Sequence, residues 1–126
     1  FKIDHEIFNF SSNLVEYFSK INLAITRSGS SILAELTNAN IPFISVPLPS
    51  AAENHQLKNA IYYKKKGFSF LIEEKDLNVK LAYLLVSVFK DNSKLAEIKK
   101  KQSQYSDKYV YNNIENVIKE IMYEKN

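Results

Sequence analysis

A short polar turn in the first half of the chain has the residue types of an anion-binding site. Arg27, Ser28 and Gly29 follow an apolar run, and a helical pattern begins directly after them. Gly29 would let the backbone turn tightly and let a ligand approach closely. The first N–H groups of that helix, including those of Ser31 and Ile32, lack intrahelical partners and point out of its positive end, which suits a phosphate. The alternative is that a serine of this turn merely caps the helix.

A carboxylate lies about one turn further along the same helical pattern. Glu35 could accept two hydrogen bonds from a vicinal diol such as a ribose. The alternative is an ordinary surface glutamate, which the helix dipole favours near an N-terminus. The residues alone leave both interpretations open.

A second polar cluster follows the loop at residues 47–54. His55 and Gln56 stand at the start of another helical pattern, and Asn59 follows one turn after His55. Amide and imidazole groups both donate and accept hydrogen bonds in fixed directions, so they can recognise sugar hydroxyls. The alternative is a helix start that carries exposed polar residues with no ligand.

The apolar runs around these two turns predict the framework that positions them. Residues 23–26 and 41–47 are nearly continuous apolar runs, which are typical of strands covered on both faces in a parallel sheet. A helical pattern over residues 32–36 separates them, so the three form a βαβ unit. In such a sheet, ligands bind beyond the carboxyl ends of the strands. Both polar turns lie there, and we predict an α/β fold.

The rest of the chain predicts a regular series of further elements. Gly67 stands where a helix end needs a positive φ angle. The aromatic side chains at 62, 63, 68 and 70 are expected to pack rather than to form a stacking surface. The expected elements are a strand over 5–10, a helix capped by Ser12, a helix over 54–66, a strand over 68–72, a helix capped by Asp76 with an apolar stripe from Leu77 to Val88, and helices over 93–105 and 110–122.

Composition excludes several classes of function. The chain has 126 residues, of which 45% are hydrophobic, so it is long enough for one ordinary domain core. It contains no cysteine, which excludes a disulfide framework, a thiolate zinc site and a cysteine nucleophile. Its two histidines have no carboxylate at ligand spacing, and it has no Walker sequence, Gly-x-Gly-x-x-Gly motif or Gly-x-Ser-x-Gly elbow.

Charge gives a weak signal. The net charge is +3, and Arg27 is the one arginine among 17 basic residues. The lysines gather in the second half, in runs at 64–66 and 99–101. A nucleic-acid binder usually shows a stronger bias with aromatic side chains on the same face. We therefore expect a solvated surface and no nucleic-acid partner.

Taken together, the two turns resemble a known family. The matching stretches are residues 23–36, Ile41-Pro42, Val46-Pro47, 54–56 and Asn59-Ala60. They resemble the carboxy-terminal domain of the MurG family, the glucosaminyltransferases of peptidoglycan synthesis with the two-domain GT-B architecture. The resemblance implies that residues 1–126 are a single partial domain, a Rossmann-like parallel-sheet domain that binds the UDP-sugar donor. The amino-terminal acceptor domain would then be absent, and since the first residue is Phe1, we expect an excised piece.

The resemblance also implies roles for individual residues. In the family, the backbone at Ser31 and Ile32 binds the α-phosphate of the donor, the glutamate at Glu35 holds the ribose, and Gln56 holds the hydroxyls of the transferred sugar, with His55 beside it. Ile32 stands where the family often has threonine, so a hydroxyl contact to phosphate is lost. The full implied donor site is Arg27, Ser28, Gly29, Ser31, Ile32, Glu35, His55, Gln56 and Asn59.

The activity that the resemblance implies is an inverting transfer of N-acetylglucosamine from UDP-N-acetylglucosamine to undecaprenyl-diphospho-N-acetylmuramoyl pentapeptide. In that scheme no metal or other cofactor is needed, because a helix terminus stabilises the leaving diphosphate. No catalytic residue is expected in this chain. The lipid-linked acceptor would bind through the missing amino-terminal domain, at the cytoplasmic face of the inner membrane, where the family works as a peripheral enzyme.

Three alternatives stay open at this point. The chain could belong to another GT-B enzyme, such as a glycolipid synthase or a sugar-nucleotide epimerase. It could be a non-catalytic donor-binding subunit of a two-component UDP-N-acetylglucosamine transferase. A lysine-rich nucleic-acid binder is the third, and it would show binding that falls steeply with salt.

Overall fold

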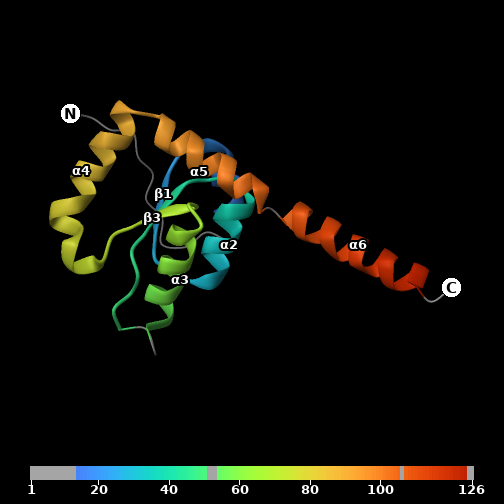
Figure 1. The fold of residues 1–126 in the computed structure, drawn as a ribbon. Coiled ribbons are helices and arrows are strands. Elements are labelled where there is room, and N and C mark those ends of the chain that lie inside the picture. The colour runs from blue at the N-terminus through green and yellow to red at the C-terminus, as the bar shows by residue number, and fades with distance from the viewer. Residues whose placement is uncertain (1–13, 51–53, 106, 125–126) are drawn as a thin grey trace.

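A three-stranded parallel sheet forms the centre of the protein (Figure 1). The computed structural model describes residues 14–50, 54–105 and 107–124. Strands β1 (Ala24–Thr26), β2 (Phe43–Ser45) and β3 (Ser69–Leu71) pair in that order, and every pair is parallel. Each strand lies within an apolar run that predicted it, so the α/β prediction is confirmed. The strand expected over 5–10 and the Ser12 cap lie outside the described residues.

Helices connect these strands, cover the sheet and follow it in the chain. They are α1 (Leu14–Tyr17), η1 (Phe18–Lys20), α2 (Ser30–Asn38), α3 (His55–Lys65), η3 (Glu74–Asp76), α4 (Leu77–Lys90), α5 (Ser93–Gln104) and α6 (Asp107–Glu124). Helix α2 connects β1 to β2, and α3 connects β2 to β3, as the βαβ pattern predicts.

The two faces of the sheet carry separate hydrophobic clusters. Successive residues of a strand point to opposite faces, and β2 follows this rule closely. Phe43 packs with Leu33 and Leu36 of α2 on one face. Ile44 packs with Ile72 on the other, where the leucines of α4 cover it. Because β2 is the central strand, its residues are buried on both sides, which explains its continuous apolar sequence.

The helix ends agree with the sequence at one position and differ at another. Gly67 follows α3 with a φ of 80°, the left-handed conformation that its position predicts. Asp76 does precede α4, but its side chain makes no cap hydrogen bond. Instead, the Asp76 carboxylate pairs with the Lys80 ammonium at 3.4 Å, so the predicted cap is wrong in its contact.

The amino edge of the sheet is closed by a buried amide. Gln102 of α5 is fully buried, and its Nε2 donates to the carbonyl oxygens of Ile41 at 2.8 Å and Phe68 at 3.1 Å. These two carbonyls directly precede β2 and β3, apart from Pro42 between Ile41 and β2. Gln102 therefore joins the starts of both strands to α5.

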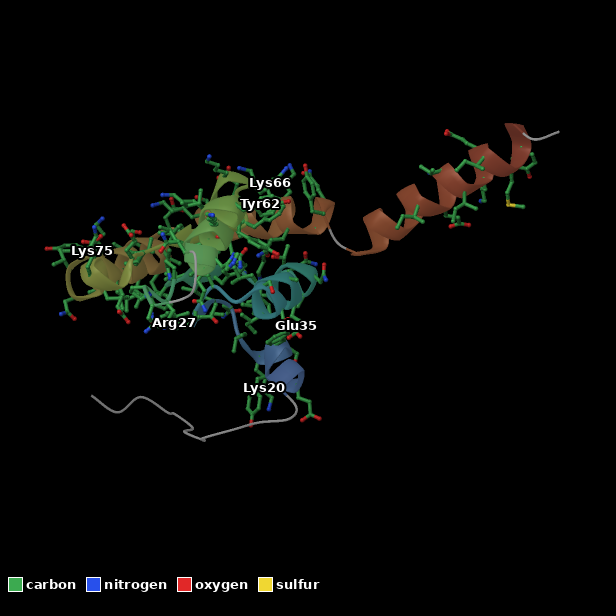
Figure 2. The ribbon with its side chains drawn as sticks, turned by 90° about the horizontal axis from the view of Figure 1, so that it is seen from below. Lys20, Arg27, Glu35, Tyr62, Lys66 and Lys75 are labelled. Carbon is green, nitrogen blue, oxygen red and sulfur yellow. The ribbon has the colours of Figure 1, made fainter. Side chains whose placement is uncertain are left out.

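The expected aromatic packing holds, with one exception. The Tyr63 ring contacts those of Phe43 and Phe68 edge to face, with centroids 5.9 and 6.2 Å apart. Tyr62 is 55% exposed instead, and the Lys66 ammonium lies 5.7 Å from its ring centroid. Figure 2 shows these two side chains together on the outer side of the molecule.

Helix α6 projects away from the rest of the protein (Figure 1). One row of its apolar side chains is half exposed or more: Ile114, Val117, Ile118, Ile121 and Met122. Within the described ranges, α6 included, no helix has both the length and the apolar character to cross a membrane.

Candidate donor-binding site

Three loops meet at the carboxyl edge of the sheet, one after each strand, and Arg27 joins them. Arg27 follows β1, and its Nη1 donates to the carbonyl oxygen of Val46, after β2, at 3.4 Å. Its Nη2 forms an ion pair with Glu74, after β3, at 2.5 Å. The guanidinium is planar and carries several donors, which is why one side chain can bridge two loops at once.

Ser28 is held from both sides by helix α3. Gln56 Oε1 accepts from the Ser28 N–H at 3.3 Å and from the Leu48 N–H at 2.9 Å. Asn59 Nδ2 donates to the Ser28 carbonyl oxygen at 3.1 Å. Ser28 itself is fully buried, and its Oγ has no hydrogen-bond partner among the described residues. The structure thus brings together three residues of the two predicted turns.

Helix α2 begins directly after Ser28 and Gly29, and the N–H groups of Ser31 and Ile32 make no hydrogen bond to the described residues. The first N–H of α2 that bonds back is that of Leu33, to the Gly29 carbonyl oxygen at 3.2 Å. The N–H groups of Ser31 and Ile32, which precede Leu33 in the same first turn, therefore lie at the positive end of the helix. No serine side chain caps the helix, so the capping alternative is wrong.

One expectation about Gly29 is corrected. Its φ is −65° with ψ 143°, an extended conformation that any residue adopts, so the tight turn does not require glycine. A Cβ at this position would find only Ile32 Cγ2 nearby, at 3.8 Å. There is therefore room for a ligand beside the backbone at Gly29, as the sequence predicts.

Glu35 lies on the exposed side of α2. The apolar neighbours Leu33 and Leu36 are buried, as expected, whereas the Glu35 carboxylate faces solvent. Figure 2 shows it standing apart from Arg27, so the only acidic side chain of α2 is not used to neutralise that cation. A carboxylate in this place is available to hydroxyl groups of a ligand.

The start of α3 is polar and open. Asn54 precedes the helix with a φ of 57°, a left-handed conformation that asparagine tolerates. His55 is exposed at the first helical position. Gln56 Nε2, unlike its oxygen, makes no hydrogen bond to the described residues and remains a free donor at this edge.

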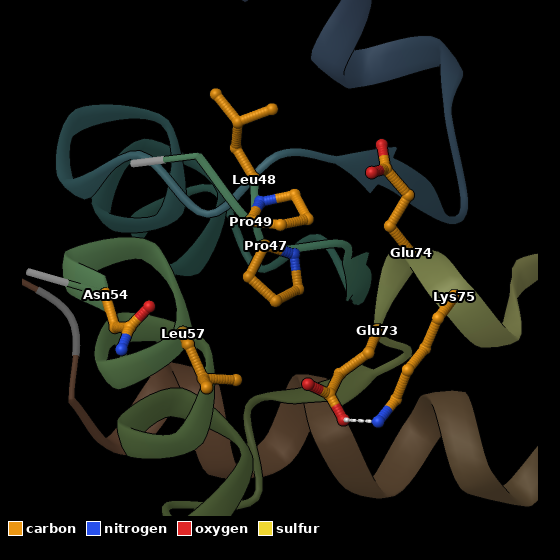
Figure 3. A pocket seen from close by; sticks show the side chains of 8 residues that line it. All are labelled: Pro47, Leu48, Pro49, Asn54, Leu57, Glu73, Glu74 and Lys75. Carbon is orange, nitrogen blue, oxygen red and sulfur yellow. Dashed lines mark ion pairs between the residues drawn. The ribbon is translucent and has the colours of Figure 1, made fainter. Parts of the chain in front are cut away.

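A cavity of about 240 Å³ opens beside Leu48 and the start of α3 (Figure 3). Its walls come from the loop after β2, the first turn of α3 and the segment after β3. Glu73 pairs with Lys75 at 3.9 Å across its rim. The lining residues are Pro47, Leu48, Pro49, Asn54, Leu57, Glu73, Glu74 and Lys75.

The charges at this edge balance one another. Arg27 is paired with Glu74, and Lys75 is paired with Glu73. Attraction for an anion must therefore come mainly from oriented N–H groups and the α2 dipole, which act at short range. Among the described residues, no group of three or more His, Cys, Asp or Glu side chains could hold a metal ion.

Comparison with known proteins agrees with this geometry. A family model described as "Glycosyltransferase family 28 C-terminal domain" matches residues 1–120. The chain belongs to this family. A relative from Pelagibacter ubique (strain HTCC1062) is 36% identical over 113 residues, which cover 89% of this chain and 32% of that protein. A relative from Rickettsia massiliae (strain Mtu5) is 31% identical over 121 residues, covering 95% and 32%.

Both relatives carry one name: UDP-N-acetylglucosamine--N-acetylmuramyl-(pentapeptide) pyrophosphoryl-undecaprenol N-acetylglucosamine transferase. The present chain covers about a third of the length of these two relatives. The fold is similar to the crystal structure of MurG from Acinetobacter baumannii, with a TM-score of 0.69 and 23% identity, over 80% of this chain and 29% of that one.

Sequence reasoning missed several groups that build this family 28 site. Glu74 pairs with Arg27, and the backbone of Leu48 bonds to Gln56. Glu74 could have been found, because it closely follows a predicted strand and so must lie at the same edge. The Leu48 N–H carries no sequence signal, since every residue but proline has one.

Proposed function

We propose that this chain is the donor-binding part of an enzyme that transfers N-acetylglucosamine from UDP-N-acetylglucosamine to undecaprenyl-diphospho-N-acetylmuramoyl pentapeptide in peptidoglycan synthesis. The observation that carries the proposal is the start of α2, where free N–H groups lie between the buried Ser28 and the exposed Glu35. The names of the relatives supply the substrates, and family membership supports applying them here.

In this proposal the donor lies along the carboxyl edge of the sheet. The Ser31 and Ile32 N–H groups bind the diphosphate, and Glu35 accepts hydrogen bonds from the ribose. His55 and the free Nε2 of Gln56 meet the sugar. Ser28, Gly29 and Asn59 shape the turn between them, with Arg27 behind it. The support is that the bonds to Ser28 bring the two predicted turns to one edge.

The reaction is an attack by an acceptor hydroxyl on the anomeric carbon of the sugar, with inversion and with UDP as the leaving group. The bond from the anomeric carbon to the diphosphate oxygen breaks, and negative charge grows on that oxygen. Oriented N–H groups stabilise such charge without reorganising during the reaction. The base that removes the hydroxyl proton is proposed to lie in the remaining two thirds of the enzyme, together with the acceptor site.

The acceptor-binding part of the enzyme would determine where the whole enzyme lies in the cell. The acceptor named for the relatives is linked to a lipid. We therefore place the whole enzyme at the membrane surface, at the cytoplasmic face, as a peripheral protein.

Titration of the chain with UDP-N-acetylglucosamine, UDP-glucose and UDP-galactose tests the donor. We expect UDP-N-acetylglucosamine to bind most tightly in isothermal titration calorimetry. Equal affinities for the three would overturn the choice of sugar, and no binding of any would overturn the donor site itself. Asn78→Ala on the exposed side of α4 is a matched surface variant that should bind as the wild type does.

A transfer assay tests whether the base and the acceptor site lie outside this chain. With UDP-N-acetylglucosamine and the lipid-linked acceptor, we expect no turnover by the chain alone, because the base and acceptor site are not in it. Detectable transfer by the chain alone would overturn the two-part interpretation. Transfer that appears only when a separate acceptor-binding chain is added would favour the two-component alternative over a single polypeptide.

A further inference from the structure

We propose that Asn59 is a positioning residue for diphosphate binding: it acts through the Ser28 carbonyl and does not touch the donor. This inference rests on the proposed function. Asn59 Nδ2 lies 3.1 Å from the Ser28 carbonyl oxygen, so one of its two N–H bonds points at the backbone. Asn59 is half-buried on α3, with its amide directed toward the loop after β1.

The geometry around Ser28 explains why such a contact matters. Gln56 and Asn59 are three positions apart, so they share one face of α3. Gln56 Oε1 accepts from the Ser28 N–H, and Asn59 donates to the Ser28 carbonyl. The two bonds fix both peptide units of Ser28, one on each side of its Cα. Few rotations remain for the backbone that leads into α2.

The free donors of α2 follow directly after this fixed point. The Ser28 carbonyl and the Gly29 N–H belong to one peptide unit, and Gly29 accepts the first intrahelical bond from Leu33. Ser31 and Ile32 then present their N–H groups at a direction set by that unit. Electrostatic stabilisation depends on donors that are oriented before the ligand arrives. Loss of the Asn59 hydrogen bond would keep the Ser31 and Ile32 N–H groups at the helix start but would fix their orientation less well.

The hydrogen bonds to Ser28 and Leu48 also limit which groups of a ligand Gln56 can bind. Its oxygen already accepts two N–H groups, from Ser28 and Leu48. Only Nε2 is left, so Gln56 can donate to a sugar oxygen but cannot accept from a sugar hydroxyl. The two amide side chains thus divide the work: Asn59 positions the turn, whereas Gln56 both positions it and faces the sugar.

The decisive experiment compares UDP with uridine, which lacks the diphosphate. In Asn59→Ala, we expect the affinity for UDP to fall roughly three- to tenfold, the range for one lost neutral hydrogen bond, with uridine binding unchanged. Asn59→Asp keeps the shape of the side chain but points an acceptor at the Ser28 carbonyl, so it should lose more UDP affinity than Asn59→Ala. Circular dichroism checks that each variant folds.

A spectroscopic signature locates the effect. In ¹⁵N–¹H spectra without ligand, the Gly29 amide signal should shift in Asn59→Ala, because its peptide unit loses a hydrogen bond. Asn78→Ala is the matched control, since it removes the same amide from the exposed side of α4 and should move neither the signal nor the affinity.

Each remaining outcome overturns a specific part of the inference. Equal losses of UDP and uridine affinity would show general loosening of the site, and unchanged UDP affinity would show that the contact does not matter; either result overturns the role of Asn59. A wild-type chain that binds no UDP would overturn the proposed function, and with it any diphosphate role for Asn59. That result is read before any variant is compared.

Discussion

The two edges of the sheet use the same side-chain amide in opposite ways. At the carboxyl edge, Gln56 accepts two backbone N–H groups with its oxygen. At the amino edge, Gln102 donates to two backbone carbonyls with its nitrogen. The difference follows from chain polarity. Loops that leave parallel strands lead into helix starts, which have spare N–H groups, whereas helix ends and strand starts have spare carbonyls.

The consequence for ligands is an asymmetry. The amide of Gln102 is fully buried and closes the amino edge, whereas Gln56 is half-buried and its Nε2 makes no hydrogen bond to the described residues. An edge with spare N–H groups attracts anions, and an edge with spare carbonyls would repel them. Substitutions at the two edges should therefore have different effects, on stability at the amino edge and on binding at the carboxyl edge.

The largest expected effect is on stability at the amino edge. Gln102→Leu removes the side-chain donor to the carbonyls of the buried residues Ile41 and Phe68, which should lower the free energy of unfolding by about 2–4 kcal/mol. Urea denaturation measures this loss. Gln104→Leu, on the exposed side of the same helix, is the control and should change little. Similar losses in both variants would show that Gln102 does not close the edge.

The second effect is on binding at the carboxyl edge. Glu35→Ala should lower the affinity for UDP at least about tenfold, because charge-assisted hydrogen bonds to the ribose are lost. Stability should not change, since the carboxylate is exposed. Glu120→Ala on α6 removes the same charge far from the site. If 2′-deoxy-UDP loses equal affinity for the wild type and for Glu35→Ala, Glu35 does not hold the ribose.

A third comparison uses the two glycines, one at each edge. Gly67→Ala should lower the free energy of unfolding by about 1 kcal/mol, because φ is 80° and a Cβ would lie 2.6 Å from Lys101 Cδ. Gly29→Ala should leave stability unchanged, because the new methyl group would meet only Ile32 Cγ2 at an ordinary contact distance of 3.8 Å, but it should lower the affinity for UDP by occupying the space beside the backbone. If Gly29→Ala lowers stability but not UDP affinity, the assignment of ligand binding to the carboxyl edge at Gly29 is wrong.

The smallest expected effect is a dependence on alkaline pH. Burial, and then the neighbouring Tyr62, raise the pKa of the Tyr63 phenol above its usual value. In the unfolded chain this phenol loses its proton near pH 10, whereas the folded protein still holds it. Stability should therefore fall as pH rises through about 10, and Tyr63→Phe should show a shallower fall. Tyr123→Phe, which is exposed on α6, should match the wild type.

Local patterns predicted most of the fold. The strands, the βαβ order and the end of α3 at Gly67 all follow from apolar runs and from backbone preferences that act within a few residues. The caps at α2 and α4 were wrong in detail, because a serine or aspartate near a helix start need not make the cap bond. Substrate contacts of the nine predicted site residues stay predictions.

Contacts between distant residues could not be predicted in the same way. Arg27 and Glu74 are 47 positions apart, and Gln102 and Ile41 are 61 apart. Such pairs depend on how the layers pack, which no periodicity records. Gln102 also stands directly after three lysines, in a stretch that looks wholly solvent-exposed. Its burial follows only from the angle at which α5 crosses the strand starts.

The order of the strands in the sheet bears on how the chain acquires its structure during synthesis. Each strand pairs with the strand that follows it in the sequence, so neither pairing has to wait for a distant segment. The β1–α2–β2 unit can close first, and β3 can add to it after α3 has formed. Pairings between segments that are close in sequence form faster than pairings between distant ones, and one helix separates the strands of each pair here. Growth in one direction, from β1 to β3, also limits the time that the edge of β2 is exposed to other chains on the ribosome.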